Sequence, residues 1–296
     1  MKIGVFARTA ERWLNGDPTS FADFRDLALA TEAAGLDSFW LPDHLTYYPP
    51  DGEPLGCWET FTILGGLASV TSTIALGPFV TAIGFRNPAL LAKMVTTLDG
   101  MSGGRFILGL GAGNWEAEHR AFGYPFDHRA GRFEEAIGIL APLLRDGAVD
   151  FRGRYHSTAD CILRPRGPSP SGPPIWIGAK GERMLRIGVR HAGGYVAIWP
   201  TTLAQVVAER ERLAAACADA GRDPATIDLV VGTHVLLPED ARTASDDRVI
   251  SGTHEEIAAR LQEFADAGVA HVVVDPRPDI SLRAVEELGR VAELVR

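Results

Sequence analysis

One pattern repeats along most of this chain: a short run rich in valine, isoleucine and phenylalanine, followed by a longer segment with helical periodicity. The strand-like runs begin near Ile3, Ser38, Ile74, Phe106, Ile175, Tyr195, Leu229 and His271. Strands that alternate with helices form parallel sheets through βαβ crossovers, and eight such units close a (β/α)8 barrel. The repetition therefore predicts an α/β protein with a (β/α)8 TIM barrel, and an open doubly wound sheet is the alternative.

Helix-terminus signals support three of the intervening helices. Ser20 is a capping residue before an apolar stripe, and Gly35 lies where the residue after the helix is expected. Pro88 is placed to begin a second helix, because proline is favoured at the first helical position. Thr253 and Glu256 have capping-box spacing before a third helix. These signals support the fold and say little about chemistry.

The fourth and fifth strand-like runs are 69 residues apart, which is about twice the usual spacing. This segment contains a helical pattern over 129–145, a hairpin-like pattern over 149–163 and a proline-rich loop over 164–174. It is too short to form a second core of its own. We therefore expect one domain over 1–296, with an insertion at about 115–173.

Composition limits the partners. The chain has 29 lysine and arginine residues against 38 aspartate and glutamate residues, a net charge of −9. This balance argues against nucleic acid or an anionic membrane as a partner. The three cysteines are far apart, and the eight histidines show no metal-ligand spacing. The uncharged stretch 60–85 is interrupted by glycine and proline and is a poor membrane span. We expect a cytoplasmic protein without a metal.

The strongest acid/base candidate is the pair Asp43 and His44, directly after the second strand-like run. In (β/α)8 barrels, reactive groups lie at the C-terminal ends of the strands. An imidazole beside a carboxylate can titrate near neutrality and exchange a proton with a substrate. The alternative is an Asp-His pair that only fixes a loop.

Gly109, Gly111 and Gly113 end the fourth run. The third glycine comes one position early for a GxGxxG dinucleotide fingerprint, so Rossmann-type binding is disfavoured. The glycines indicate either a backbone that a flat ligand approaches closely or tight packing of a strand against a helix.

The end of the fifth run is also rich in glycine and carries two cations. Free N–H groups at the start of a helix, with basic side chains nearby, suit a phosphate group. A surface turn with solvated charges is the alternative. The residues concerned are Gly178, Ala179, Lys180, Gly181 and Arg183.

Large aromatic side chains fall in or beside the same strand-end loops. Together they predict an apolar pocket for a flat cofactor and an organic substrate, although any one of them alone suits a protein core equally well. They are Tyr47, Tyr48, Trp58, Trp115 and Trp199.

Several stretches together resemble the bacterial-luciferase-like flavin and deazaflavin oxidoreductases. They occur in family order over nearly the whole chain, at 38–44, 86–93, 97–105, 108–113, 116–123 and 252–256. The match is closest to the branch that depends on coenzyme F420, a deazaflavin. The resemblance implies a single barrel that holds the cofactor ring at its C-terminal mouth.

The resemblance also assigns roles to residues. Asp43 would face the polar edge of the ring system, and His44 would be the proton donor or acceptor at its reactive face. A bulge with a non-proline cis peptide supports the back of the ring in this family, and we expect it at Phe79-Val80 or one bond earlier. The remaining cofactor contacts that the resemblance implies are Thr81, Ala112, Gly113 and Asn114, with Lys180 and Gly181 at the phosphate.

The implied activity is hydride transfer between C5 of coenzyme F420 and a small organic substrate. One alternative is an FMN-dependent monooxygenase that receives reduced flavin from a partner reductase, and another is a non-catalytic flavin-binding barrel. Sugar-phosphate dehydrogenases of the family have a catalytic glutamate where this chain has Asn114, so that substrate is not implied. The family commonly forms dimers, and we therefore expect a homodimer.

Overall fold

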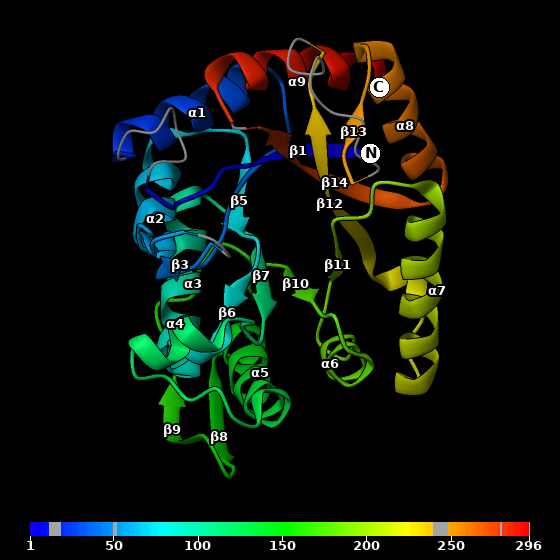
Figure 1. Ribbon diagram of the computed structural model, residues 1–296. Coiled ribbons are helices and arrows are strands. Elements are labelled where there is room, and N and C mark those ends of the chain that lie inside the picture. Colours follow the sequence, from blue (N-terminus) through cyan, green and yellow to red (C-terminus); the bar gives the residue numbers. More distant parts are fainter. Residues whose placement is uncertain (12–18, 50–51, 239–247, 279, 296) are drawn as a thin grey trace.

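A parallel sheet forms the centre of the molecule (Figure 1). The computed structural model describes residues 1–11, 19–49, 52–238, 248–278 and 280–295. Each strand-like run of the sequence lies in a strand of this sheet or within two residues of one. The strands are β1 (Lys2–Phe6), β2 (Ser38–Leu41), β5 (Ala75–Pro78), β6 (Thr81–Ala82), β7 (Leu108–Gly111), β10 (Ile175–Gly178), β11 (Gly194–Ile198), β12 (Asp228–Leu236) and β14 (Val269–Arg277).

The sheet closes on itself. Its strands follow the order β5-β2-β1-β14-β12-β11-β10-β7-β6, and β5 and β6 are consecutive segments of the chain. Pro78, at the end of β5, pairs with Leu41 of β2. Thr81, at the start of β6, pairs with Leu110 of β7. The two segments therefore act as one barrel strand, which confirms the predicted TIM barrel. The peptide bond Phe79–Val80 between them is cis, as expected.

Helices cover the outside of the barrel, and the three predicted helix starts are confirmed. Ser20 caps the first helix, Pro88 is the first residue of the third, and the Thr253 side chain accepts a hydrogen bond from the Glu256 N–H. The covering helices are α1 (Phe21–Ala33), α2 (Thr60–Val70), α3 (Pro88–Ser102), α5 (Arg129–Asp146), α6 (Glu182–Gly188), α7 (Leu203–Ala220), α8 (His254–Asp266) and α9 (Leu282–Val295).

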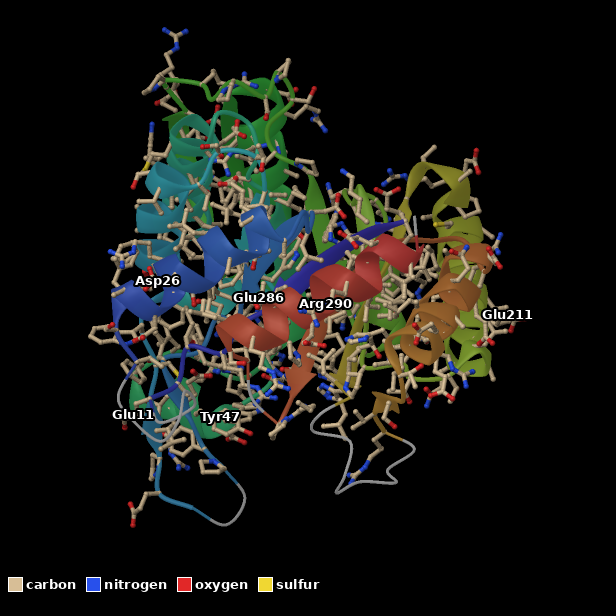
Figure 2. The ribbon with its side chains drawn as sticks, turned by 90° about the horizontal axis from the view of Figure 1, so that it is seen from above. Glu11, Asp26, Tyr47, Glu211, Glu286 and Arg290 are labelled. Atoms are coloured by element: carbon tan, nitrogen blue, oxygen red, sulfur yellow. The ribbon has the colours of Figure 1, made fainter. Side chains whose placement is uncertain are left out.

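α9 shows how a covering helix separates its two faces. Val285, Leu288 and Val291 are buried against the barrel side, whereas Glu286 and Arg290 are exposed. Figure 2 shows α9 beside α1, and these two helices are in contact. This amphipathic pattern is what a helix on a barrel surface requires.

A cluster of apolar, mostly aromatic side chains fills the barrel interior. Trp40 and Trp176 stack with ring centroids 4.8 Å apart, and Phe79 meets the Trp40 ring edge-on at 5.7 Å. Phe6 also belongs to this cluster. Because these rings occupy the interior, open space is left at the C-terminal mouth, where Phe6 and Phe79 line a cavity.

The insertion follows the predicted pattern with one addition. The expected hairpin is present as β8 (Ala148–Arg152) and β9 (Ser157–Ile162), and the expected helix is α5. A further short helix, α4 (Glu116–Ala121), precedes α5. Figure 1 shows β8 and β9 projecting away from the barrel.

Other short elements were not predicted from the sequence. Two of them form an antiparallel ribbon, β3 (Thr46–Tyr47) with β4 (Leu55–Gly56), and β13 (Ile250–Ser251) pairs with β12. Two single turns of 3₁₀ helix cover Ile83–Phe85 and Pro224–Thr226. In the described part of the chain, every helix is too short or too polar to cross a bilayer.

Candidate functional site

Two adjoining cavities lie at the C-terminal mouth of the barrel. The main cavity has a volume of about 800 Å³, and the side chamber has a volume of about 240 Å³. Phe6, Pro42, His44 and Trp199 line both, so these residues form the wall that the two cavities share. Both cavities therefore lie at the end of the barrel where (β/α)8 enzymes carry their reactive groups.

Most of the residues assigned to the cofactor line the main cavity. They are Asp43, Phe79, Val80, Ala112, Gly113, Asn114, Gly178, Ala179, Lys180 and Gly181. Thr81 and Arg183 line neither cavity among the described lining residues. Thr81 is fully buried in its strand, and the Arg183 side chain is largely exposed and lies 3.7 Å from Glu134.

The aromatic residues divide between the two cavities. Trp115 lines the main cavity, Tyr47 lines the side chamber, and Trp199 lines both. Tyr48 lies near the Trp115 ring, at 6.4 Å between centroids. Trp58 is not among the described lining residues; it is half exposed and donates its indole N–H to the Thr19 carbonyl at 2.7 Å.

Asp43 contacts an arginine rather than its neighbour His44. Arg86 donates to both carboxylate oxygens, at 2.7 and 2.9 Å, and the Ala82 N–H donates to one of them at 3.0 Å. Burial by itself lowers the pKa of Arg86, but the carboxylates of Asp43 and Glu59 outweigh it, so this pKa is raised. Asp43 is thus a buried carboxylate with an ion-pair partner, and it anchors the floor of the main cavity.

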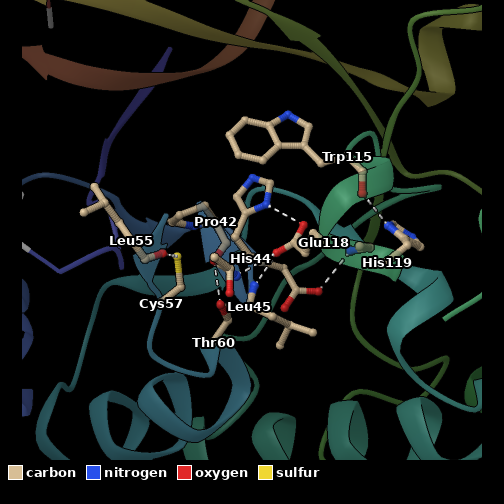
Figure 3. Close-up of polar contacts among 12 residues, drawn as sticks. Pro42, His44, Leu45, Leu55, Cys57, Thr60, Trp115, Glu118 and His119 are labelled. Atoms are coloured by element: carbon tan, nitrogen blue, oxygen red, sulfur yellow. Dashed lines mark hydrogen bonds and ion pairs between the residues drawn. The ribbon is translucent and has the colours of Figure 1, made fainter. Parts of the chain in front are cut away.

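His44 contacts Glu118, a residue of α4 (Figure 3). Its Nδ1 lies 3.1 Å from Glu118 Oε2, and its ring packs against Trp115 at 5.1 Å between centroids. Because Nδ1 is engaged, Nε2 is the ring nitrogen left for a ligand. The imidazole is about a quarter exposed and lines both cavities, so it can reach a reacting group at their junction.

The Glu118 carboxylate is held by three donors. Besides His44, it accepts the backbone N–H groups of Leu45 and Thr46. Its side chain is only 2% exposed. These contacts hold the Glu118 carboxylate in place, and through it the ring of His44. The sequence marks Glu118 as part of the family-like stretch 116–123. It does not show that this carboxylate contacts His44.

The glycines of β7 make room for a neighbouring segment of the chain. A Cβ atom on Gly109 would lie 2.1 Å from the Pro78 carbonyl oxygen, and one on Gly111 would lie 3.0 Å from Val80. Gly178 on β10 would meet Val80 at the same distance. These three positions let the segment between β5 and β6 enter the mouth, where Phe79 and Val80 line the main cavity.

The far side of the main cavity carries positive charge. Lys180 is exposed, and Arg129 donates to the Gly113 carbonyl at 2.7 Å. Arg212 donates to the Lys180 carbonyl at 3.1 Å, which fixes the loop after β10. A Cβ atom on Gly181 would meet nothing within 4 Å, so this loop leaves space beside it. Apolar walls with cations at one end fit a flat cofactor that carries a phosphate.

The side chamber contains a cysteine that is not prepared for nucleophilic chemistry. Burial raises the pKa of the Cys57 thiol to about 12, so the thiol stays protonated near neutral pH. Among the described residues, no group of three or more His, Cys, Asp and Glu side chains is placed to hold a metal ion. Among the described residues that line both cavities, His44 is the one with an ionisable side chain.

Trp199 separates the cavities. It has a backbone φ of +66°, which non-glycine residues rarely adopt, and its N–H donates to the Gly232 carbonyl at 2.8 Å. Its ring contacts Phe6 at 5.7 Å and stacks on His234 at 4.2 Å. Backbone conformations with this kind of strain are found most often at functional sites.

Comparisons with known proteins agree with this architecture. A phthiodiolone/phenolphthiodiolone dimycocerosates ketoreductase from Mycobacterium tuberculosis is 31% identical over 221 residues, which are 69% of this chain and 58% of that protein. An F420-dependent secondary alcohol dehydrogenase in complex with an F420-acetone adduct superposes with a TM-score of 0.83 at 18% identity, over 100% of this chain and 99% of the other. EDTA monooxygenase from Chelativorans sp. BNC1 gives 0.81 at 14%, over 99% and 93%.

At these identities the two structures show the fold alone. The comparison with protein families goes further. The family described as luciferase-like monooxygenase matches residues 1–249 of this chain. This match covers every barrel strand except β14, and all the residues that line the main cavity. The chain belongs to the luciferase-like monooxygenase family.

Proposed function

We propose that this protein is an oxidoreductase that transfers a hydride between coenzyme F420 and a small organic substrate. The observation that carries the proposal is the junction of the two cavities, where His44 faces both and is held by the buried Glu118. One cavity is large enough for a ring cofactor, and the other holds a small partner beside it. Such an arrangement places two reactants face to face, which supplies much of the catalysis in hydride transfer.

In this proposal the cofactor occupies the main cavity. Phe79, Val80 and Ala112 supply apolar walls for the ring, and Lys180 and Arg129 lie at the end where a phosphate is expected. When bound, the reduced deazaflavin supplies a hydride. Asn114, which stands where a related group has a catalytic glutamate, lines this cavity as well.

His44 would manage the proton that accompanies the hydride. In carbonyl reduction, the carbonyl carbon receives the hydride and its oxygen takes a proton, so the C=O double bond becomes a C–OH single bond. The imidazole donates this proton from Nε2, and the contact with Glu118 at Nδ1 holds the ring in position for the transfer. In the reverse direction, neutral His44 accepts the proton from the alcohol.

The ketoreductase relative supports reduction of a carbonyl group rather than oxygenation. The family description favours the alternative, an FMN-dependent monooxygenase supplied with reduced flavin by a separate reductase. A barrel that binds a flavin without catalysis is the third candidate.

We propose in addition that the protein forms a homodimer and acts in the cytoplasm. Sedimentation analysis of the purified protein tests the assembly.

An equilibrium titration decides between the first two candidates. The purified protein is titrated with oxidised coenzyme F420 and, separately, with FMN, and binding is followed by fluorescence. Micromolar affinity for F420 with weak affinity for FMN is the expected result. The reverse preference would overturn the proposal in favour of the monooxygenase, which would then show oxygen consumption with reduced FMN. Binding of neither would limit the family relationship to the fold.

A further inference from the structure

The side chamber has a polar wall that the proposed hydride transfer does not use. This wall comes from the C-terminal ends of three neighbouring strands: Arg8 follows β1, His234 lies in β12, and Asp275 and Arg277 lie in β14. Because β14 pairs with both β1 and β12, barrel closure brings together four side chains that are as far apart as 269 positions in the sequence, from 8 to 277.

One carboxylate oxygen organises the wall. Asp275 Oδ2 lies 2.8 Å from an Arg8 nitrogen, 3.1 Å from His234 Nδ1 and 3.3 Å from an Arg277 nitrogen. Asp275 is the one carboxylate among the described residues that line this chamber. It therefore fixes two guanidinium groups and one imidazole in place, rather than leaving them on mobile side chains.

Fixed guanidinium groups are suited to one kind of ligand. Their planar fork of N–H donors matches a carboxylate, and hydrogen bonds between opposite charges are about twice as strong as neutral ones. Arg8 is buried, so its charge is little screened by water, whereas the Arg277 side chain is about one third exposed. Both guanidinium groups have partners besides Asp275: Arg8 donates to the Pro278 carbonyl at 3.2 Å, and Arg277 donates to His234 Nδ1 at 3.3 Å. An anionic group entering the chamber would share their oriented N–H donors with these partners.

The wall faces the reactive end of the site. His44 lines the side chamber as well as the main cavity, and His234 is stacked on the dividing Trp199 with an angle of 16° between the ring planes. A ligand that fills the chamber therefore has one end at the arginines and the other at the imidazole of His44. The chamber volume of about 240 Å³ is below the roughly 300–1,000 Å³ of sites for drug-sized ligands, so the ligand is small.

We propose that the side chamber binds a small organic carboxylate, with its anionic group at Arg8 and Arg277 and its reactive carbon near His44. The identification of this ligand as the substrate rests on the proposed hydride transfer. The site itself does not, because it is defined by the side chamber and not by the cofactor. The chemical class is thus a short oxo acid or hydroxy acid.

The test compares pyruvate with pyruvamide, its neutral isostere, by titration calorimetry on the intact protein with and without the cofactor that binds. We expect pyruvate to bind with a Kd on the order of 1 mM, and pyruvamide to bind at least about tenfold more weakly. In Arg277→Gln, pyruvate affinity should fall about tenfold or more, whereas pyruvamide affinity should hardly change. Arg277→Lys should recover part of the loss, because it keeps the charge without the fork.

The matched control is Arg260→Gln, which removes an exposed arginine from α8, outside the described lining of both cavities. It should bind pyruvate like the unaltered protein, and circular dichroism should show all variants folded. Equal affinity for the two probes, no binding of either, or an equal loss in Arg260→Gln would overturn the proposal. Pyruvate binding without F420 binding would leave the carboxylate site standing and the proposed hydride transfer refuted.

Discussion

At the residue scale, His44 is the group on which the proposed chemistry depends. We expect His44→Ala to reduce turnover by about 10²–10⁴-fold, the usual contribution of a general acid or base. Cofactor affinity should remain nearly unchanged, because apolar walls and distant cations hold the cofactor. Steady-state kinetics with a parallel cofactor titration measures both effects. Turnover at the original level would remove His44 from the mechanism.

Glu118 is a positioning residue that acts through His44. We expect Glu118→Gln to lower kcat by about tenfold, because an amide holds the imidazole of His44 in position less well than the carboxylate does. KM and cofactor affinity should remain nearly unchanged. Glu116→Gln, in the same helix and outside the described lining of the cavities, is the matched control. A purely structural role would weaken cofactor binding together with kcat.

His271 is a buried residue whose contribution to the free energy of unfolding depends on pH. It is 3% exposed and lies 2.7 Å from the Ser38 hydroxyl, and burial together with nearby positive charge lowers its pKa from 6.5 to about 3. Between pH 6.5 and 3 the unfolded chain therefore binds a proton that the folded protein excludes. The free energy of unfolding contributed by this site falls as the pH falls through that window.

Between pH 7 and pH 5 this site should remove about 2 kcal/mol of stability. We expect His271→Gln to make the loss smaller by about that amount, measured by urea unfolding at both pH values. His128→Asn, which changes an exposed histidine, should leave the loss as it is. The same pH dependence in His271→Gln as in the unaltered protein would contradict the assignment.

At the scale of elements, local signals placed the helices because capping involves residues only a few positions apart. In α8, the Thr253 hydroxyl accepts the Glu256 N–H at 3.3 Å, and the Glu256 side chain accepts the Thr253 N–H at 2.8 Å. The short elements β3, β4 and α4 have no such signal. They depend on contacts with distant parts of the chain, such as those of Glu118 with the segment after β2.

The cap of α8 provides a prediction at this scale. Thr253→Ala should lower the free energy of unfolding by about 1 kcal/mol, because an N–H at the helix start loses its partner. Thr253→Ser keeps the hydroxyl and should cost much less. Chemical denaturation of the two variants measures the difference, and equal stability of both would show that the hydroxyl does not contribute.

At the scale of the whole molecule, barrel closure and the cavity floor depend on the same glycine. A methyl group on Gly109 would lie 2.1 Å from the carbonyl oxygen of Pro78, the last residue of β5 before the segment that joins it to β6. We expect Gly109→Ala to cost about 2–3 kcal/mol of stability and to weaken cofactor binding at least tenfold, because backbone must move. Thermal unfolding and the cofactor titration measure the two effects.

The control for that substitution is Gly100→Ala in α3. A methyl group there would meet nothing within 4 Å, and alanine favours a helix by roughly 0.8–1 kcal/mol over glycine. This variant should be slightly more stable and should bind the cofactor normally. If both variants behaved alike, the effect at Gly109 would come from loss of a glycine and not from crowding at the cavity floor.

The sequence by itself determined the eight barrel strands, the covering helices α1, α3, α5 and α8, and the position of His44 after β2, because hydrophobic periodicity and caps are properties of neighbouring residues. Most of the residues that the family-like loops assigned to a cofactor line the main cavity. Only the tertiary structure decided which carboxylate His44 contacts, since Glu118 is 74 positions away, and which side chains surround Asp275. The physical reason is barrel closure: parallel strands bring their C-terminal ends to one edge, and side chains meet there whatever their separation along the chain.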